Sequence, residues 1–521
     1  MRVVSELSDP YLVQTREHLE KLLCGDVTAD EFCRFCLKQD LLPQLSGLDE
    51  AEQCDRISRR VDFLLSVFPD FVDFQENDLK ISREISLAFN LWQMWIPMAE
   101  AYIRGWEHKQ KDGRQSHVPY FVLLSGAQGS GKTVSTSVLK WLIPRMRSES
   151  YNDDSFKVDI ISIDSLYKTN KDRIEFRNEL RIQCGLQAAG DHDQKLESAL
   201  KNAISLIRDI EWVLGTPREH NPAEHKLVER TPEEKKALTR EKADVLPDKI
   251  AQAVCASVDE NPYNLPAELR KRILDHFLAQ AGVGAEKAKT VRAAAVNGNP
   301  FYEIARGLPN THYVDQFMEI YRGLCGEADF IELPDFEKLY HGGVGDVKSL
   351  DRIEKTDFPQ IFFLEGWFVG VPTGLNMDKV EEIIQSDEYV TEMMDVLDPE
   401  RKFTPVMLDY LKKYQKIWDL FDNKTFLLID DIRNVEQSRT RQEQTNRRHR
   451  IAELKAEGKT DQEISKMKLG MTEEEIKTFV RPYILLTYII LRMDPEQMDA
   501  EMIYHTDSSD YMPRKIDIIS D

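Results

Sequence analysis

The chain has 521 residues, of which 41% are hydrophobic and 31% are charged, and its formal net charge is -22. This composition is ordinary for a globular protein, and the length predicts about two to four domains. The acidic balance argues against broad binding to nucleic acid or to anionic lipid, because both require a basic surface.

Residues 1–117 are predicted to be helical. Thr28 and Glu31 have the spacing of a capping box, and the ranges 56–68 and 85–103 carry large apolar residues at helical intervals. The beginning of the chain lacks the apolar segment of a signal peptide. We find no catalytic pattern in this region and interpret its aromatic residues as packing.

The seven cysteines are an odd number spread along the chain, which predicts reduced thiols and a cytoplasmic location. Cys33 and Cys36 form a CxxC pair within a helical pattern, with no second pair and no βαβ context. We interpret this pair as part of a buried helix face, with a metal or redox role as the alternative.

The central motif is a glycine-rich turn between an apolar run and a helix. Residues 118–125 are apolar, the turn is Gly126-Ala-Gln-Gly-Ser-Gly-Lys-Thr133, and a helical pattern covers 134–143. This order is the signature of a phosphate-binding loop, whose backbone N–H groups and helix N-terminus attract phosphate. The residues predicted to surround the phosphates are Gly126, Gln128, Gly129, Ser130, Gly131, Lys132 and Thr133.

Two side chains of this loop have predicted roles of their own. Lys132 can reach the β- and γ-phosphates of a nucleoside triphosphate, and Thr133 can offer its hydroxyl to Mg²⁺. The chain is therefore predicted to bind a nucleoside triphosphate together with Mg²⁺.

A second buried strand is predicted over 158–164 and ends at Asp164. An open α/β sheet builds its binding site at the carboxyl ends of its strands. A carboxylate there can accept a proton from an attacking hydroxyl or hold a Mg²⁺-bound water. The alternative for Asp164 is a helix cap.

Residues 186–296 are predicted to form a helical insertion without strands, with apolar residues at helical intervals and prolines between the segments, among them Pro217, Pro222, Pro232 and Pro247. The insertion is interpreted as an oligomer contact, a cover for the site or a structural addition, and the sequence does not distinguish these.

A turn follows at Arg306-Gly-Leu-Pro-Asn-Thr-His312. Arg306 and His312 could bind an anionic acceptor, the arginine through two parallel hydrogen bonds. Each could equally be a structural residue.

The next strand is predicted over 360–364 and ends at Glu365. An acidic residue at the end of an apolar strand fits a Walker B position, where a carboxylate reaches Mg²⁺ or its water shell.

The last strong strand is predicted over 425–429, with a short final strand at 515–519. The segment 433–450 between them is basic and helix-prone, and could close over the phosphates as a lid. A solvated helix is the alternative.

The apolar run 483–491 is far shorter than the ~20 residues of a membrane helix.

Several of these segments resemble a known family. The glycine-rich turn and Ser162-Ile-Asp-Ser-Leu-Tyr167 resemble the group that includes uridine kinase, phosphoribulokinase and pantothenate kinase. Five more segments, in this order, resemble D-glycerate 3-kinase, and the resemblance covers roughly 85–185 and 297–490. They are Arg306-Gly-Leu-Pro-Asn-Thr-His312, Phe336-Glu-Lys338, Leu364-Glu-Gly-Trp367, Tyr414-Gln-Lys-Ile-Trp-Asp419 and Gly470-Met-Thr-Glu-Glu-Glu-Ile-Lys-Thr-Phe-Val480.

The resemblance implies a P-loop NTPase-type α/β fold, in which a five-stranded parallel sheet is flanked by helices and carries a lid. It implies that Lys132 binds the β- and γ-phosphates and that Thr133 and Glu365 organise Mg²⁺. Asp164 matches the base that activates the acceptor hydroxyl. Arg306, His312 and Lys338 match acceptor-binding positions, and Arg439 matches an arginine of the lid.

The acceptor side differs from the family pattern at five positions, whereas the ATP-handling positions are kept. The differing residues are Ser165, Tyr313, Glu337, Val347 and Ser438. ATP-dependent phosphoryl transfer is therefore better indicated than the identity of the acceptor.

The sequence thus predicts an N-terminal helical region (1–117), a kinase core in two parts (118–185 and 297–521, with the lid around 431–475) and the insertion (186–296). The predicted function is Mg²⁺- and ATP-dependent phosphorylation of a hydroxyl on a small acidic acceptor, with D-glycerate first. The alternatives are a nucleoside, a pantothenate-like acid or a sugar phosphate as acceptor, or a non-catalytic ATP-binding scaffold. No nucleic-acid or membrane partner is expected, and the helical additions could support a homo-oligomer.

Overall fold

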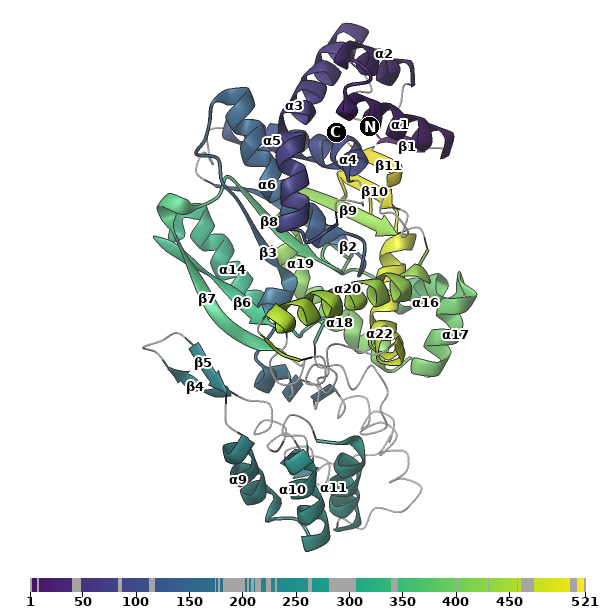
Figure 1. The fold of residues 1–521 in the computed structure, drawn as a ribbon. Coiled ribbons are helices and arrows are strands. Elements are labelled where there is room, and N and C mark those ends of the chain that lie inside the picture. Colours follow the sequence, from purple (N-terminus) through teal and green to yellow (C-terminus); the bar gives the residue numbers. More distant parts are fainter. Residues whose placement is uncertain are drawn as a thin grey trace.

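We describe the protein from a computed structural model (Figure 1). The structure describes residues 2–6, 9–39, 48–82, 87–111, 118–173, parts of 175–210, 217–221, 226–229, 232–260, 265–280, 306–338, 345–398, 401–429, 431–456, 458–460, 473–506 and 513–519.

A seven-stranded sheet in the order β1-β11-β10-β9-β2-β8-β3 forms the centre of the fold. Five strands are parallel: β3 (Val158–Ser162), β8 (Ile361–Gly366), β2 (Tyr120–Gly126), β9 (Asn423–Ile429) and β10 (Met502–Thr506). Two antiparallel strands follow β10: β11 (Pro513–Ile519), and β1 (Arg2–Glu6) at the edge. The predicted α/β class, with a P-loop NTPase-type parallel sheet flanked by helices, is confirmed.

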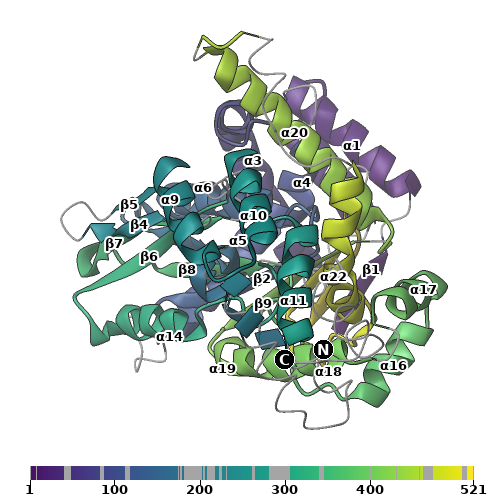
Figure 2. The ribbon, with the colours of Figure 1, turned by 90° about the horizontal axis from the view of Figure 1, so that it is seen from below.

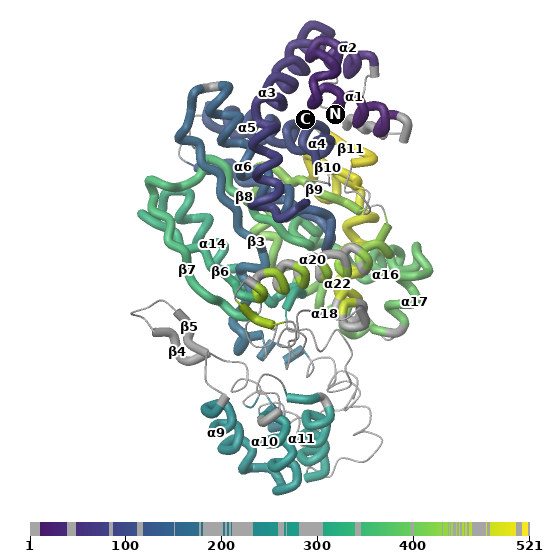
Figure 3. Tube along the Cα trace, in the orientation of Figure 1, coloured from purple at the N-terminus to yellow at the C-terminus, as the bar shows by residue number. Residues whose placement is uncertain are grey.

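Two strands of this sheet were not predicted. The region 1–117 was expected to contain helices alone, but β1 pairs with β11, and the two termini therefore lie close together (Figure 3). β10 is the other. Both are five residues long, and their partner strands supply the backbone hydrogen bonds that hold them. Neither is long enough to give an apolar alternation that the sequence pattern reveals.

The two faces of the sheet are covered by two separate sets of helices. Side chains alternate along a strand, so Val122 and Leu124 of β2 face one core while Phe121 and Leu123 face the other. The first core includes α1 (Asp9–Cys24), α2 (Ala29–Gln39), α3 (Glu50–Asn77), α5 (Ile96–Lys111) and α6 (Lys132–Tyr151). The second includes α14 (Val314–Arg322), α16 (Met377–Gln385), α17 (Glu388–Leu397), α18 (Phe403–Leu411), α19 (Gln415–Trp418) and α22 (Glu473–Arg492).

The N-terminal helical region packs against α6, the helix that follows the glycine-rich loop. Trp95, in a π-helical turn (η2, Leu91–Trp95), donates its indole N–H to Ser135 Oγ of α6 at 3.0 Å. Trp92 is fully buried beside it, in agreement with the interpretation of these aromatics as packing. α6 carries the loop at its N-terminus, so its position depends on these contacts.

The cysteine pair and the capping box lie in the same region. Cys36 is buried and Cys33 half-buried on α2, and burial raises the pKa of both thiols, that of Cys33 to about 11. Neither sulfur is therefore a thiolate near neutral pH, which fits a packed helix face. The predicted capping box is confirmed, since Thr28 N–H donates to Glu31 Oε2 at 2.9 Å and Glu31 N–H to Thr28 Oγ1 at 3.3 Å.

The insertion lies at the opposite end of the molecule from α1–α3 (Figure 1). Its helices α9 (Pro232–Ala243), α10 (Asp248–Glu260) and α11 (Ala267–Gln280) surround their own small core, which includes Val254, Leu269 and Ile273. It was expected to contain no strands, but β4 (Pro217–Asn221) and β5 (Lys226–Glu229) form an antiparallel pair. Their polar residues carry no strand periodicity. Homo-oligomerisation through the helical additions stays a prediction.

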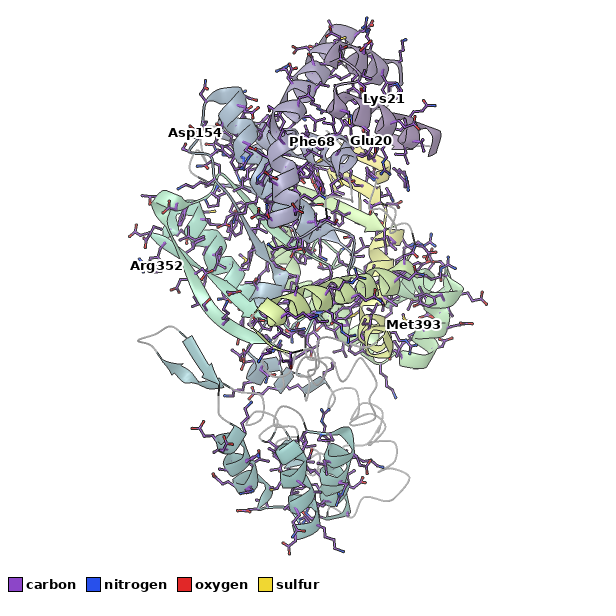
Figure 4. The ribbon with its side chains drawn as sticks, viewed as in Figure 1. Glu20, Lys21, Phe68, Asp154, Arg352 and Met393 are labelled. Carbon is purple, nitrogen blue, oxygen red and sulfur yellow. The ribbon has the colours of Figure 1, made fainter. Side chains whose placement is uncertain are left out.

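Two further elements approach the carboxyl end of the sheet. One is the hairpin of β6 (Phe330–Glu337) and β7 (Asp346–Glu354), where the guanidinium carbon of Arg352 lies 3.6 Å from the ring centroid of Phe330 (Figure 4). The other is α20 (Asn434–Ala456), which runs beside α22 (Figure 2). Within the described residues, no helix combines the length and apolarity needed to span a membrane.

Candidate functional site

The glycine-rich loop has a backbone conformation that needs glycine at several positions. Gly129 and Gly131 have φ values of 79° and 85°, in the left-handed region that favours glycine. A Cβ on Gly126 would overlap Ser130 Oγ and lie 3.0 Å from the carbonyl oxygen of Leu427. α6 begins at Lys132, directly after this turn, so its positive end faces the loop.

Lys132 stands at the centre of a group of charges. Its Nζ donates to the carbonyl oxygen of Ala127 at 3.4 Å, and its side chain is half-buried. Burial lowers the pKa of its ammonium, and the nearby carboxylates of Glu365 and Asp164 oppose this effect. The cations Lys338 and Arg439 lower that pKa further.

The five charged groups come from separate segments and leave the site with an excess of positive charge. Three of them are cations (Lys132, Lys338 and Arg439) and two are carboxylates (Asp164 and Glu365). A triphosphate carries several negative charges, so this balance suits it.

Strand register explains why Glu365 reaches the loop. β8 lies between β2 and β3, and Glu365 is paired with Leu124 on one side and Ser162 on the other. Glu365 is buried, and its Oε2 has no hydrogen-bond partner within the described part of the chain. A buried carboxylate oxygen without a partner is costly, and a cation would satisfy it.

The described residues contain no group of three or more His, Cys, Asp or Glu side chains that could hold a metal by themselves. This does not conflict with a Mg²⁺ site, because Mg²⁺ bound with nucleotide takes one or two protein ligands and completes its shell with phosphate and water. Glu365 fits such a position, and the exposed Thr133 beside Lys132 can supply a hydroxyl.

Other polar atoms around the loop are also buried without a hydrogen-bond partner among the described residues. They are Ser125 Oγ, Gln128 Oε1 and Ser130 Oγ. Such atoms are few in folded proteins, and each calls for an explanation. Their concentration at one loop is what a polar ligand would account for.

Asp164 is held as a carboxylate by its neighbours. It lies in a 3-10 turn (η3, Ile163–Leu166), where Ser162 Oγ accepts a hydrogen bond from its backbone N–H. Lys338 Nζ lies 2.8 Å from Asp164 Oδ2. Burial would raise the pKa of Asp164, but Lys338 and a hydrogen bond from Tyr167 outweigh it and hold that pKa well below its ordinary value.

His312 is buried and neutral. Burial lowers the pKa of its imidazole to about 3, although Asp164 opposes the shift. Its Nδ1 lies 2.8 Å from the hydroxyl of Tyr414, and this hydroxyl accepts a hydrogen bond from the backbone N–H of Asn310. The Tyr414 proton is then available for Nδ1, which leaves the histidine proton on Nε2.

A neutral imidazole with its proton on Nε2 limits how His312 could bind an acceptor. It can donate one hydrogen bond from Nε2, an atom that has no partner among the described residues, but it cannot add positive charge to an acceptor site.

Arg306 lies next to Lys338. Its Nη1 donates to the carbonyl oxygen of Lys338 at 3.3 Å, and its own carbonyl accepts from the hydroxyl of Tyr483 at 2.9 Å. The predicted acceptor residues Arg306 and Lys338 are therefore in contact, although they are separated by 32 positions in sequence, and Lys338 also pairs with Asp164.

Arg173 is a residue that the sequence analysis missed. It is fully buried, donates to the carbonyl oxygen of Gly345, and lies 5.1 Å from the ring centroid of Phe336. Burial lowers its pKa to about 10, Asp346 opposes this, and Arg306 adds to it. No motif surrounds Arg173 in the sequence, so no local signal could have identified it.

Arg439 reaches the site from α20, and its charge acts on both Lys132 and Tyr483. The rest of the predicted lid, toward residue 475, is described only in part. The side chains of Gln442 and Glu443 and the backbone of 461–472 lie outside the described residues, as does Asp430.

Replacing Gly307 by alanine should destabilise the protein by about 2 kcal/mol or more and lower activity. Gly307 has a φ of 102°, and a Cβ would overlap the ring of Tyr483. Its carbonyl also accepts the indole N–H of Trp367 at 3.0 Å. Thermal unfolding measures the effect, with Gly374→Ala as control because a Cβ on Gly374 meets nothing within 4 Å. Equal melting temperatures for the two variants would contradict the expected strain.

Replacing Lys338 by methionine should move the acid limb of the kcat/KM profile to higher pH by about one unit or more. Lys338 lowers the pKa of Asp164, so its loss leaves burial to raise that pKa, and Asp164 becomes protonated at a higher pH. Lys157→Met is the control, since Lys157 pairs with Asp357 at 2.6 Å in an exposed pair before β3. If the acid limb stays at the same pH, whatever the change in rate, Lys338 does not set the ionisation of Asp164.

Comparisons with known proteins found no matching family model and no matching curated sequence. Among solved structures, the chain is similar to D-glycerate 3-kinase from Cryptococcus neoformans var. grubii serotype A, with 15% identity and a TM-score of 0.43 over 80% of this chain and 96% of that one. It is also similar to the YGR205w protein, with 18% identity and a TM-score of 0.39 over 82% of this chain and 97% of that one. These values are too low to carry an argument about function, which rests on the site itself.

Proposed function

We propose that this protein is a Mg²⁺- and ATP-dependent phosphotransferase that phosphorylates a hydroxyl of a small acidic acceptor, with D-glycerate as the first candidate. One observation carries the proposal. A glycine-rich loop, a buried carboxylate oxygen that has no hydrogen-bond partner among the described residues (Glu365) and an ion-paired carboxylate (Asp164) lie at the ends of three adjacent parallel strands. A scaffold that merely bound ATP would need neither carboxylate.

The loop and the cations around it would hold the triphosphate. Backbone N–H groups of the loop, the N-terminus of α6 and Lys132 face the same point, and Arg439 would add charge from α20. Glu365 and Thr133 would hold Mg²⁺, which supplies charge neutralisation at the phosphates when it is bound.

Asp164 would orient the acceptor hydroxyl by accepting its hydrogen bond. The acceptor oxygen forms a bond to the γ-phosphorus, the bond from that phosphorus to the β–γ bridging oxygen breaks, ADP leaves, and the hydroxyl proton passes to Asp164. A carboxylate with a lowered pKa is a weak base. That suffices in a loose transition state, where orientation and charge stabilisation contribute more than early proton removal.

The neighbours of Asp164 favour an acceptor that carries a carboxylate. Lys338 pairs with it, Arg306 contacts the backbone of Lys338, and the Nε2–H of His312 would be a further donor. Two cations and a neutral donor suit a small acid better than an uncharged nucleoside. A pantothenate-like acid or a sugar phosphate meets the same charge requirement, so these acceptors belong in the test.

The test is release of ADP from Mg²⁺-ATP with and without D-glycerate, followed by the other acceptors. Strong stimulation by D-glycerate supports the proposal as stated. If only another acid stimulates ADP release, the protein is still a phosphotransferase, and that acid replaces D-glycerate as the proposed acceptor. Tight ATP binding without stimulation by any acceptor would favour the scaffold instead.

A further inference from the structure

A pocket of about 1140 Å³ lies beside the candidate functional site, and its lining is basic. It is walled by β7, the start of α14, the segment around α19, and residues of the segments 168–169 and 310–313. Five lysines line it: Lys168, Lys348, Lys412, Lys413 and Lys416. Asp315 and Glu319 also line it. An excess of cations in one pocket stands out on a chain whose net charge is -22.

A short two-stranded ladder separates this pocket from the acceptor side. Lys168 N–H donates to the carbonyl oxygen of Thr311, and Tyr313 N–H to that of Leu166, both at 2.8 Å, around an antiparallel bridge between Tyr167 and His312. The rings of Tyr167 and His312 stack with centroids 4.6 Å apart.

Because side chains alternate along extended backbone, Lys168 and Tyr313 lie on the other side of this ladder from the two stacked rings. Tyr167 hydrogen-bonds Asp164, whereas Lys168 and Tyr313 line the pocket. Neither Asp164 nor Lys132 belongs to that lining, but His312 of the candidate functional site does. The pocket therefore adjoins the candidate functional site at His312, and the charged groups around Lys132 lie outside it.

Three of the five lysines have carboxylate partners. Lys416 lies 2.6 Å from Asp315, Lys348 lies 3.0 Å from Asp335, and Lys412 lies 3.2 Å from Asp409. These pairs leave the remaining two lysines as the source of uncompensated charge.

Lys168 and Lys413 make no ion pair among the described residues. Burial lowers the pKa of Lys168, and the charge of Lys413 lowers it further, with Asp172 and Glu179 in opposition. Lys413 Nζ donates instead to the amide oxygen of Asn310 at 2.9 Å. Lys168 is half-buried and Lys413 is exposed. Because their ammonium groups repel each other, an anion between them would stabilise both.

We propose that this pocket, the lysine pocket, binds a small molecule that carries a phosphate and at least one further anionic group. Lysines act as point charges toward phosphate, and the volume is large enough for a nucleotide or a phosphorylated sugar. A single phosphate ion would fill only a small part of this volume, and water would occupy the rest.

The lysine pocket is connected to the acceptor side by hydrogen bonds. Lys413 bonds the Asn310 side chain, the Asn310 backbone N–H bonds the Tyr414 hydroxyl, and that hydroxyl bonds His312 Nδ1. An anion that binds Lys413 would break its hydrogen bond to Asn310 and so shift this series of hydrogen bonds. If the proposed function holds, occupancy should therefore change KM for the acceptor more than kcat.

Binding is tested by titration calorimetry of the full chain with inorganic tripolyphosphate. The wild type should show two binding events, one at the glycine-rich loop and one at the lysine pocket. Lys132→Ala should weaken the first and leave the second. Lys168→Gln combined with Lys413→Gln should weaken the second about tenfold or more and leave the first.

The matched control is Lys157→Gln combined with Lys379→Gln, which removes two exposed lysines that have carboxylate partners away from the pocket. If the pocket double variant melts early, Lys168→Gln and Lys413→Gln replace it as two single variants. Loss of both binding events in Lys132→Ala, or an unchanged second event in the pocket variants, overturns the proposal. A retained second event without acceptor-stimulated ADP release would overturn the proposed function alone.

Discussion

Replacing Lys132 by alanine should lower acceptor-stimulated ADP release by at least about 10²–10³-fold, to the background of the assay. Lys132 is the first residue of α6 and lies among two carboxylates and two further cations. Its ammonium would contact the phosphates in the ground state and stabilise charge as the γ-phosphoryl group leaves. ATP affinity should fall as well, and both effects are measured by coupled ADP detection and by nucleotide titration.

Lys140→Ala is the matched control for this variant. Lys140 lies two turns along the same helix, is exposed, and pairs with Asp159 at 2.7 Å. Lys140 is on the same helix as Lys132 and carries the same charge, but it lies outside the glycine-rich loop. The Lys140→Ala variant should therefore keep wild-type activity. Full activity in Lys132→Ala would mean that the glycine-rich loop is not where the nucleotide reacts.

Replacing Asp164 by asparagine should reduce kcat by about 10²–10⁴-fold and leave ATP binding nearly unchanged. Asparagine keeps the size of the side chain but removes the charge that pairs with Lys338 and orients the hydroxyl. Lys338 would then lack its partner, and the amide could present an N–H where the acceptor hydroxyl needs an oxygen. Turnover and nucleotide affinity measured on the same preparation separate the two effects.

Asp159→Asn provides the comparison for Asp164→Asn. Asp159 lies on β3, the strand that leads to Asp164, and its carboxylate is also ion-paired with a lysine. Its loss should change stability slightly and turnover little. If Asp164→Asn turned over ATP and acceptor as fast as the wild type, the assignment of Asp164 as the hydroxyl-orienting group would be wrong.

Much of the parallel sheet could be predicted because its signals are local. Four of the five parallel strands are apolar runs long enough to recognise, and the loop after β2 needs glycine at Gly129 and Gly131 for its backbone conformation. The acidic residues Asp164 and Glu365 were placed near the loop by the rule that parallel strands end at one edge. Their proximity to Lys132 agrees with that placement.

What the sequence could not determine depends on partners that are distant along the chain. The edge strand β1 exists because β11, from the other terminus, pairs with it. The lysine pocket gathers Lys168, Lys348 and Lys413 from three segments that are far apart along the chain.

The sequence by itself determined the glycine-rich loop, the apolar strands and the acidic residues that end two of them. A turn and a side-chain alternation are set within about ten residues of chain, so local pattern reveals them. Only the tertiary structure decided that Asp164 is ion-paired with Lys338, that His312 is neutral, and that Arg173 is buried. Ionisation depends on burial and on charges brought close by strand register and helix packing, which adjacent residues do not encode.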